Sequence, residues 1–375
     1  MAAFETIDQL CINTIRTLSI DAVQQANSGH PGAPMGLAPV AYTIWQRFLR
    51  YDPQSPTWIG RDRFVLSNGH ASMLLYSVLH LAGVVESDGK KNVTLDEIKH
   101  FRQLHSVTPG HPESFMTSGV ETTTGPLGQG CANSVGMAIA SKWLTANYGK
   151  AGFEDLFRFN VYTICGDGCM MEGISSEAAS LAAHLKLNNL CWLYDDNTVT
   201  IDGHTDLAFT ENVAARFLAY GWNVLHVSDA NDTAQLSVAL ENFQKTTDRP
   251  TFVVVKCRIG YGSPNKENTA DAHGSPLGDA EIKLTKKFYG WPEDAKFLVP
   301  DGVYDHFKNH VGKRGAELTR RGVPGSRSTS RSTPNWPRNS KRWTNATCLR
   351  GGKHPFPSSH RMPRGWQPES LRARY

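Results

Sequence analysis

Short apolar runs alternate with segments of helical periodicity along most of the chain. Runs rich in β-branched and aromatic residues are typical of strands, and they cover residues 61–67, 159–165, 190–194, 222–227 and 251–256. Apolar side chains recur every three or four residues in other segments, which predicts helices over 3–26, 37–48, 73–81, 130–139, 174–185 and 233–243. Because strands alternate with helices, we expect an α/β fold, a parallel sheet flanked by helices.

A glycine-flanked aspartate stands at the end of the central predicted strand. Gly166-Asp167-Gly168 follows residues 159–165, and Asn197 comes shortly after the strand at 190–194. Both polar side chains therefore lie just past the carboxyl end of a strand, where ligands bind in open parallel sheets. One carboxylate, one amide oxygen and a nearby backbone carbonyl form an oxygen-only set that suits Mg²⁺ with a bound phosphate. Taken alone, Gly-Asp-Gly is better explained as an ordinary turn.

Composition divides the chain near residue 318. Up to that point it is typical of a globular protein with a large core. Residues 319–375 contain thirteen Lys or Arg, one acidic residue, seven prolines and eight serines, a net charge of +12 against +4 for the whole chain. This segment has too few aliphatic residues to form a core, so we expect a disordered tail. Its charge alone would also be compatible with nucleic-acid binding.

The cysteines and the hydropathy of the chain indicate the cellular compartment in which we expect the protein. The seven cysteines lie mostly in apolar runs and form no C-x-x-C pair, so we expect buried thiols in a reducing compartment. No apolar stretch is long enough to cross a membrane, and the N-terminus lacks the pattern of a secretory signal. These features predict a cytoplasmic protein with no membrane partner.

Longer stretches resemble the thiamine diphosphate enzymes, and the transketolase family in particular. The metal–diphosphate motif is similar from Gly166 to Gly173 and is followed by Asn197. The other similar stretches are Ser28–Pro34, Ser67–His70, Thr108–Glu113 and Gly125–Gly130. The resemblance runs from near residue 3 to about residue 318, and it implies the first, diphosphate-binding (PP-type) domain of that family.

The resemblance implies a set of cofactor and metal contacts. Asp167, Asn197 and the Val199 carbonyl would bind Mg²⁺, for which Ca²⁺ or Mn²⁺ are possible substitutes. Contacts to thiamine diphosphate would come from His70, Gly125, Leu127, Gly168, Asn197, Ile201 and His273. Leu127 and Ile201 would pack on the thiazolium ring, although without the resemblance plain core packing would be the better explanation of their apolar character.

The resemblance also singles out four of the fourteen histidines. His30, His70, His111 and His273 lie in loops rich in Gly and Pro, and each matches a histidine of the transketolase active site. His30 and His273 would lie near the reacting carbonyl and the diphosphate, and His70 would contact the diphosphate and the substrate. His111 would bind the first hydroxyl of the donor. Histidine suits these catalytic roles because its pKa lies near neutrality.

The implied reaction is the transfer of a two-carbon ketol unit from a ketose phosphate to an aldose phosphate, in the pentose phosphate pathway, by a homodimer. Dihydroxyacetone synthase and deoxyxylulose phosphate synthase are rival enzymes that share the cofactor. Glu172 and Glu177 are explained either as interface residues of that dimer or as acids favoured near a helix N-terminus.

Residues 319–375 do not continue the resemblance. The family would continue into a second α/β domain, and the glutamate that activates the cofactor would come from that domain of the partner subunit. The abrupt change of composition favours the interpretation that this segment is coding sequence translated out of frame over the interpretation that it is a tail that binds nucleic acid. We therefore expect a chain incomplete by itself, with two alternatives to an active enzyme: a catalytically silent truncated product, or one half of a split transketolase whose second domain is a separate chain.

Overall fold

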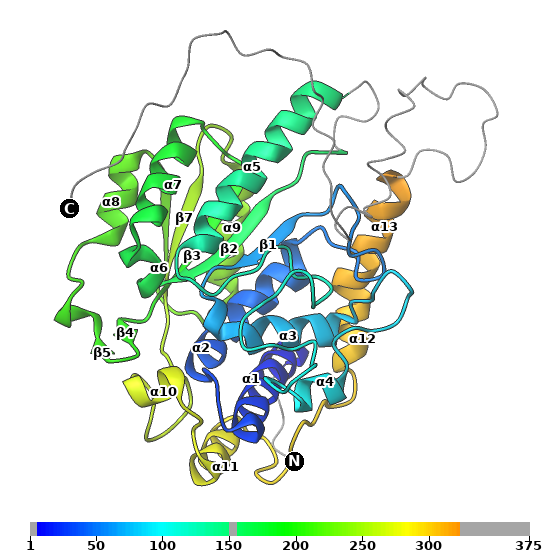
Figure 1. The fold of residues 1–375 in the computed structure, drawn as a ribbon, viewed down its shortest axis with the longest axis vertical. Coiled ribbons are helices and arrows are strands. Elements are labelled where there is room, and N and C mark those ends of the chain that lie inside the picture. Colours follow the sequence, from blue (N-terminus) through cyan, green and yellow to red (C-terminus); the bar gives the residue numbers. More distant parts are fainter. Residues whose placement is uncertain (1–5, 150–155, 323–375) are drawn as a thin grey trace, which may run out of the picture. The chain divides into compact units, whose positions relative to one another are not determined.

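A five-stranded parallel sheet lies at the centre of the computed structural model, which describes residues 6–149 and 156–322 (Figure 1). The strand order is β1-β2-β3-β7-β6, and every neighbouring pair is parallel. The strands are β1 (Arg63–Leu66), β2 (Val161–Gly166), β3 (Leu190–Asp196), β6 (Asn223–Val227) and β7 (Thr251–Lys256). The five predicted strands and the α/β class are thus confirmed.

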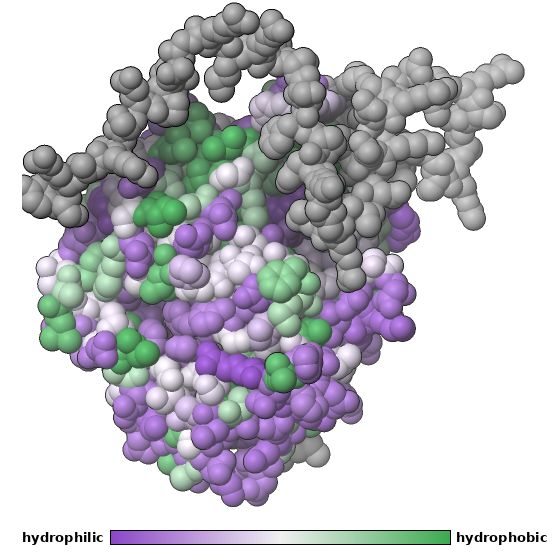
Figure 2. Space-filling view, viewed as in Figure 1, coloured by the Kyte–Doolittle hydropathy of each residue, from purple (hydrophilic) through white to green (hydrophobic). Residues whose placement is uncertain are grey.

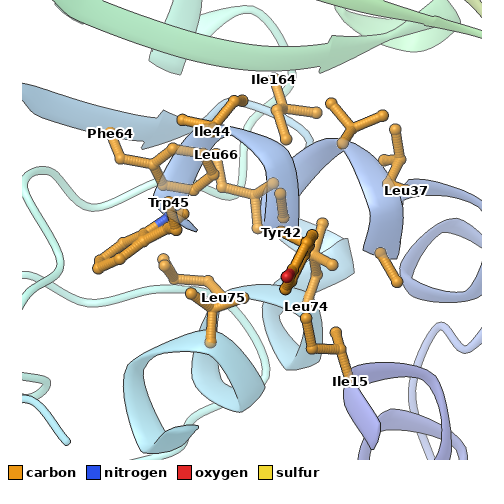
Figure 3. Close-up of a cluster of buried hydrophobic side chains, with 14 of the residues drawn as sticks. Ile15, Leu37, Tyr42, Ile44, Trp45, Phe64, Leu66, Leu74, Leu75 and Ile164 are labelled. Carbon is orange, nitrogen blue, oxygen red and sulfur yellow. The ribbon is translucent and has the colours of Figure 1, made fainter. Parts of the chain in front are cut away.

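Helices cover both faces of the sheet, which explains why the strands read as continuous apolar runs. Alternate strand residues face opposite sides: Tyr162 and Ile164 join one core, and Val161 and Cys165 join the other. Figure 3 shows part of the first core, where the ring of Trp45 packs edge-on against that of Phe64, near Leu75. The first core is formed with α1 (Ile7–Ala26), α2 (Gly32–Thr43), α3 (Ser72–Ala82) and α9 (Thr233–Lys245), and the second with α5 (Gln129–Tyr148), α6 (Asp167–Met171), α7 (Gly173–His184) and α8 (Val213–Tyr220).

Shorter elements and a C-terminal group of helices complete the described chain. They include α4 (Leu95–Lys99), α10 (Ala270–Gly274), α11 (Asp279–Phe288), α12 (Val303–Phe307) and α13 (Lys313–Gly322). A small hairpin is formed by β4 (Val199–Thr200) and β5 (Gly203–His204). Single turns are the π-turns η1 (Ile44–Phe48) and η4 (Lys308–Gly312) and the 3-10 turns η2 (Gly69–Ala71) and η3 (Thr205–Leu207). Helices α10 to α13 have no counterpart among the predicted elements.

The second helix begins earlier than predicted, at Gly32 rather than residue 37. Pro34 does not prevent this, because the first helical N–H groups have no partner within a helix and proline is tolerated there. Pro39 lies inside the helix and lacks the N–H that would bond the Met35 carbonyl. The buried Arg16 replaces that donor, with its Nε 2.9 Å from the Met35 oxygen. A side chain of α1 thus satisfies the backbone group that Pro39 leaves free.

A buried ion pair joins the C-terminal helices to α1. Lys286 of α11 donates to Asp21 of α1 at 2.6 Å, and both side chains are almost fully buried. The other Asp21 oxygen accepts from the Phe297 N–H at 2.9 Å. Because both charges are paired and hydrogen-bonded, the pair specifies where α11 docks rather than adding much stability. The segment that precedes α11 carries His273, so this docking also helps to place the site.

Other sequence predictions concern thiols, membranes and the tail. The six cysteines within the described ranges are buried and free, as expected, and Cys348 lies outside those ranges. None of the described helices is long and apolar enough to cross a membrane. Helix α13 extends to Gly322, past the predicted boundary at 318. The rest of the predicted tail, residues 323–375, lies outside the described residues.

Candidate functional site

Asp167 is the first residue of α6 and directly follows β2, at the carboxyl end of the sheet. Its side chain is 5% exposed and is held from the neighbouring strand and the turn that follows it. One carboxylate oxygen accepts from the Tyr194 hydroxyl, and the other accepts from the Thr198 N–H at 3.0 Å. These two bonds fix the carboxylate before any ligand arrives.

Asn197 lies in the adjacent turn, directly after β3. Its amide nitrogen donates to Asp195 Oδ2 at 2.8 Å, and its oxygen accepts from the Val199 N–H at 2.9 Å. The intervening Thr198 has a left-handed backbone with φ of 62°, which a non-glycine residue adopts at some cost. The structure thus brings the three predicted metal ligands, Asp167, Asn197 and Val199, into two linked turns.

Two buried acids of these turns, Asp167 and Asp195, have no ion-pair partner among the described residues, whereas the neighbouring Asp196 pairs with Lys256 at 3.3 Å. Burial raises the pKa of Asp167 to about 6 and that of Asp195 to about 7. Among the described residues, neither carboxylate forms an ion pair with a basic side chain. A bound cation would compensate this buried negative charge. The described part of the chain contains no group of three His, Cys, Asp or Glu side chains suited to a metal, so a site here depends on amide and backbone oxygens.

Glycines allow the loop from Gly125 to Gly130 to pack closely on the strand ends. A Cβ on Gly130 would lie 2.6 Å from the Cα of Ser67, and one on Gly168 would lie 2.7 Å from a Leu127 methyl group. Gly128 has a φ of 82°, in the left-handed region that favours glycine. Close packing therefore explains Gly128, Gly130 and Gly168, whereas a Cβ on Gly166 would meet nothing within 4 Å.

Three of the four predicted histidines form a compact cluster. The ring centroids of His30 and His70 are 5.0 Å apart, those of His70 and His273 are 5.0 Å apart, and those of His30 and His273 are 5.8 Å apart. His111 faces Gly125, whose added Cβ would lie 3.6 Å from the imidazole. Two locations differ from the predicted loops: His273 lies in helix α10, and His70 lies in the 3-10 turn η2.

The histidine cluster is held in the neutral state. Burial, followed by the charge of His273 and then of Arg102, lowers the pKa of His30 to about 4. Burial likewise lowers the pKa of His70 well below its usual value. The pKa values of His111 and His273 are also lowered, again mainly by burial. Neutral imidazoles carry both a donor and an acceptor nitrogen, so the cluster can bind hydroxyl and carbonyl groups at neutral pH.

Unsatisfied groups around the cluster fit a polar ligand with an apolar ring. The side-chain oxygens of Asn68 and Thr124 are buried and have no hydrogen-bond partner within the described residues, although buried polar groups are normally paired. Ile201 is 60% exposed, and its methyl group lies beside Gly274, which also borders the His30 ring. A ligand that supplied polar atoms to Asn68 and an apolar face to Ile201 would satisfy both.

Three contributors to the site were not anticipated. Tyr194 and Asp195 orient Asp167 and Asn197. The sequence could have indicated these two residues, because they lie at or just past the end of the predicted strand that precedes Asn197. Arg102 contacts His30, although it lies in none of the motifs that drew attention to the site. Only the folded structure shows that the loop after α4 brings Arg102 into contact with His30.

Comparison with known proteins agrees with this geometry. A family model described as "Transketolase, thiamine diphosphate binding domain" matches residues 7–326. The transketolase of Geobacillus stearothermophilus is 54% identical over 312 residues, which is 83% of this chain and 46% of that protein. Transketolase 1 of Escherichia coli is 54% identical over 292 residues, 78% of this chain and 43% of its own length.

Solved structures give the same result. A transketolase from Pichia stipitis in complex with sedoheptulose-7-phosphate is 46% identical with a TM-score of 0.79, over 84% of this chain and 45% of that one. A transketolase from Leishmania mexicana has a TM-score of 0.80 at 43% identity, over 85% of this chain and 46% of that one. The chain thus spans about half the length of the relatives it matches.

Two glycines of α5 provide a test of the packing that builds the site. Gly130→Ala would place a methyl group against the Ser67 backbone and should destabilise the protein by about 1–3 kcal/mol through overpacking. Gly136→Ala, in the same helix but with nothing within 4 Å, should stabilise it by about 0.5–1 kcal/mol. Urea unfolding followed by circular dichroism measures both. Equal stabilities for the two variants would contradict the close approach of the loop.

Proposed function

Because the chain belongs to the transketolase family, we propose that it supplies the diphosphate-binding half of an enzyme that transfers a two-carbon ketol unit between sugar phosphates. The observation that carries the proposal is the convergence of an oxygen donor set and a neutral histidine cluster at one end of the sheet. The first set suits a metal-bound diphosphate, and the second suits a polyhydroxylated carbonyl compound. If Gly-Asp-Gly were only a structural turn, it would require neither the oxygen donor set nor the histidine cluster beside it.

The cofactor and its metal follow from the donor set. Asp167, Asn197 and the Val199 carbonyl would hold Mg²⁺, which favours oxygen ligands and shares its coordination sphere with phosphates. Gly168 lets the backbone approach the diphosphate, whereas Leu127 and Ile201 would flank the thiazolium ring. Thiamine diphosphate, when bound, supplies carbanion stabilisation. Among the residues of this chain, Tyr194 and Asp195 would keep the oxygen ligands oriented, as partners of metal ligands commonly do.

The histidines would recognise the substrate. Pichia stipitis transketolase structures contain sedoheptulose-7-phosphate, fructose-6-phosphate and xylulose-5-phosphate, and we propose sugar phosphates of this class for the present chain. His30 and His273 would bind the reacting carbonyl oxygen, His70 the diphosphate and the substrate, and His111 a hydroxyl of the donor. Because the pKa values of all four are lowered, these contacts would be hydrogen bonds of neutral imidazoles.

An exposed apolar face supports association of two copies. Helix α7 begins just after the Gly-Asp-Gly turn and packs beside α5, and hydrophobic side chains gather over these helices (Figure 2). The apolar stripe predicted for this helix is only partly covered: Ala178 and Ala182 are buried, whereas Leu181 and Leu185 are exposed. Further exposed apolar side chains of α5, α6 and α7 are Trp143, Tyr148, Met171 and Ile174. Apolar patches of this kind are typical of protein interfaces, so we propose that the face forms a homodimer.

Removal of the Asp167 carboxylate tests the cofactor site. Asp167→Ala should weaken Mg²⁺-dependent binding of thiamine diphosphate by more than about 100-fold, since loss of an outer-shell partner alone costs 10–100-fold. The control is Asp248→Ala, an exposed aspartate that precedes β7 at the opposite end of the sheet. Titration calorimetry with and without Mg²⁺ measures the difference. Equal affinity for the two variants would refute the assignment.

A charge on α7 tests the dimer. Leu181→Glu should shift the protein from dimer to monomer, because an ionised carboxylate is expensive to bury in an interface. Val238→Glu, on the exposed side of α9 beyond the other face of the sheet, should leave the association unchanged. Sedimentation velocity over a range of concentrations distinguishes the species. A dimer that persists in the Leu181 variant would place the interface elsewhere.

Reconstitution tests the reaction itself. The chain, mixed with the remaining half of the Geobacillus stearothermophilus relative, should transfer a ketol unit from xylulose 5-phosphate to ribose 5-phosphate in the presence of thiamine diphosphate and Mg²⁺. The same mixture with Asp167→Ala should be inactive, which controls for contaminating enzyme. The chain alone should show negligible turnover. Cofactor binding without activity in the mixture would favour the silent-product hypothesis over the split enzyme.

A further inference from the structure

The Arg102 side chain joins two segments of the site. Its Nη1 donates to Ser28 Oγ at 2.8 Å, and its Nη2 lies 3.3 Å from Nδ1 of His30. Ser28 and His30 flank Gly29, whose Cβ would lie only 3.0 Å from the side chains of Phe101 and Val23. The segment that bears His30 therefore packs tightly between α1 and the loop that carries Arg102.

The loop holds Arg102 in an unusual backbone conformation. Its φ is 62°, in the left-handed region, and its N–H donates to the Thr108 carbonyl at 3.0 Å. The loop is anchored in turn by Glu97, whose carboxylate accepts from the Ser106 hydroxyl at 3.0 Å. A Cβ on Gly110 would lie 3.0 Å from Arg102 Nε, so glycine is needed there for the guanidinium to pass. Strain of this kind persists only where the surrounding structure imposes it.

The charge of Arg102 is not neutralised within the site. Among the ion pairs of the described residues, none involves Arg102, and its Nε has no hydrogen-bond partner there. Arginine has only donors and remains charged at every pH that a protein tolerates. The contact with His30 is therefore a hydrogen bond in one direction: Arg102 donates, and Nδ1 of His30 accepts.

From this contact we infer that Arg102 is a positioning residue that fixes His30 in the tautomer with its proton on Nε2. A neutral imidazole carries one proton, and Nδ1 cannot carry it while accepting from a guanidinium. The opposite nitrogen, Nε2, has no protein partner within residues 6–149 and 156–322, and it borders Gly274 next to the exposed Ile201. His30 thus presents a single N–H donor toward the side of the site where the ligand is proposed to lie.

A fixed donor has a use in the proposed reaction, on which this part of the inference rests. A preorganised N–H aimed at a carbonyl oxygen stabilises the negative charge that develops there, without reorganisation during the reaction. Burial and the charge of His273 lower the pKa of His30, and the positive charge of Arg102 adds to this effect and favours the neutral imidazole. His30 would act by hydrogen-bond donation alone, and no proton transfer from it is required.

Nitrogen-15 NMR of the ligand-free chain tests the tautomer. Long-range ¹H–¹⁵N spectra of protein labelled at histidine, with His30→Gln to assign the signals, should show Nδ1 of His30 unprotonated and Nε2 protonated. Arg102→Met should produce a mixture of tautomers at His30, and Arg102→Lys should preserve more of the Nε2–H form. Arg249→Met removes an exposed guanidinium that pairs with Asp248, and it should change nothing.

A proton on Nδ1 of His30 in the parent protein would overturn the inference, and so would an unaltered tautomer in folded Arg102→Met. If Arg102→Met does not fold, Ser28→Ala replaces it, since loss of the Nη1 acceptor should also broaden the tautomer population. In the reconstituted enzyme, Arg102→Met should lower kcat by about 10–100-fold, less than loss of a whole acid–base group, with little change in KM. An unchanged kcat would overturn the role of the fixed His30 donor in the reaction, whereas an inactive parent mixture would refute the proposed function.

Discussion

The burial of one carboxylate at the end of the sheet is the constraint on which the site depends. Asp167 is ionised only at a cost in the ligand-free protein, because burial raises its pKa from 3.8 to about 6. That shift corresponds to about 3 kcal/mol of lost stability at neutral pH; the loss is absent below about pH 4, grows as the pH rises from about 4 to 6, and is complete above pH 6. The fold tolerates it because the large apolar cores on both faces of the sheet lie directly behind the turn.

Much of the fold was predictable from the sequence because helices cover both faces of the sheet. Buried parallel strands appear as apolar runs, so β7 was predicted with its observed bounds and β2 and β3 to within two residues at each end. Helix α2 was predicted too late, since its start contains Gly and Pro, which normally interrupt helices. Its stability there depends on Arg16, a residue of another helix, and no local pattern reveals that partner.

The residues of the site were predictable only where they belong to a motif. Motif glycines marked the places where loops approach one another, and the clustering of His30, His70 and His273 agrees with their motifs. Their chemical roles remain proposals. Arg102 could not be found in this way, because its function depends on a loop that returns from α4 and on a strained backbone conformation. Residues that orient other residues leave a weak trace in a single sequence.

The position of α7 has a consequence for how the protein would respond to concentration. This helix follows the short helix α6 that begins with Asp167, and the exposed Leu181 and Leu185 lie on α7 and just after it. If ligand binding orders the turn in the geometry that the paired copies prefer, thermodynamic linkage makes the effect reciprocal: association raises ligand affinity by the same factor by which ligand favours association. Ligand affinity would then depend on protein concentration, and a dilute sample would be a weaker binder than a concentrated one.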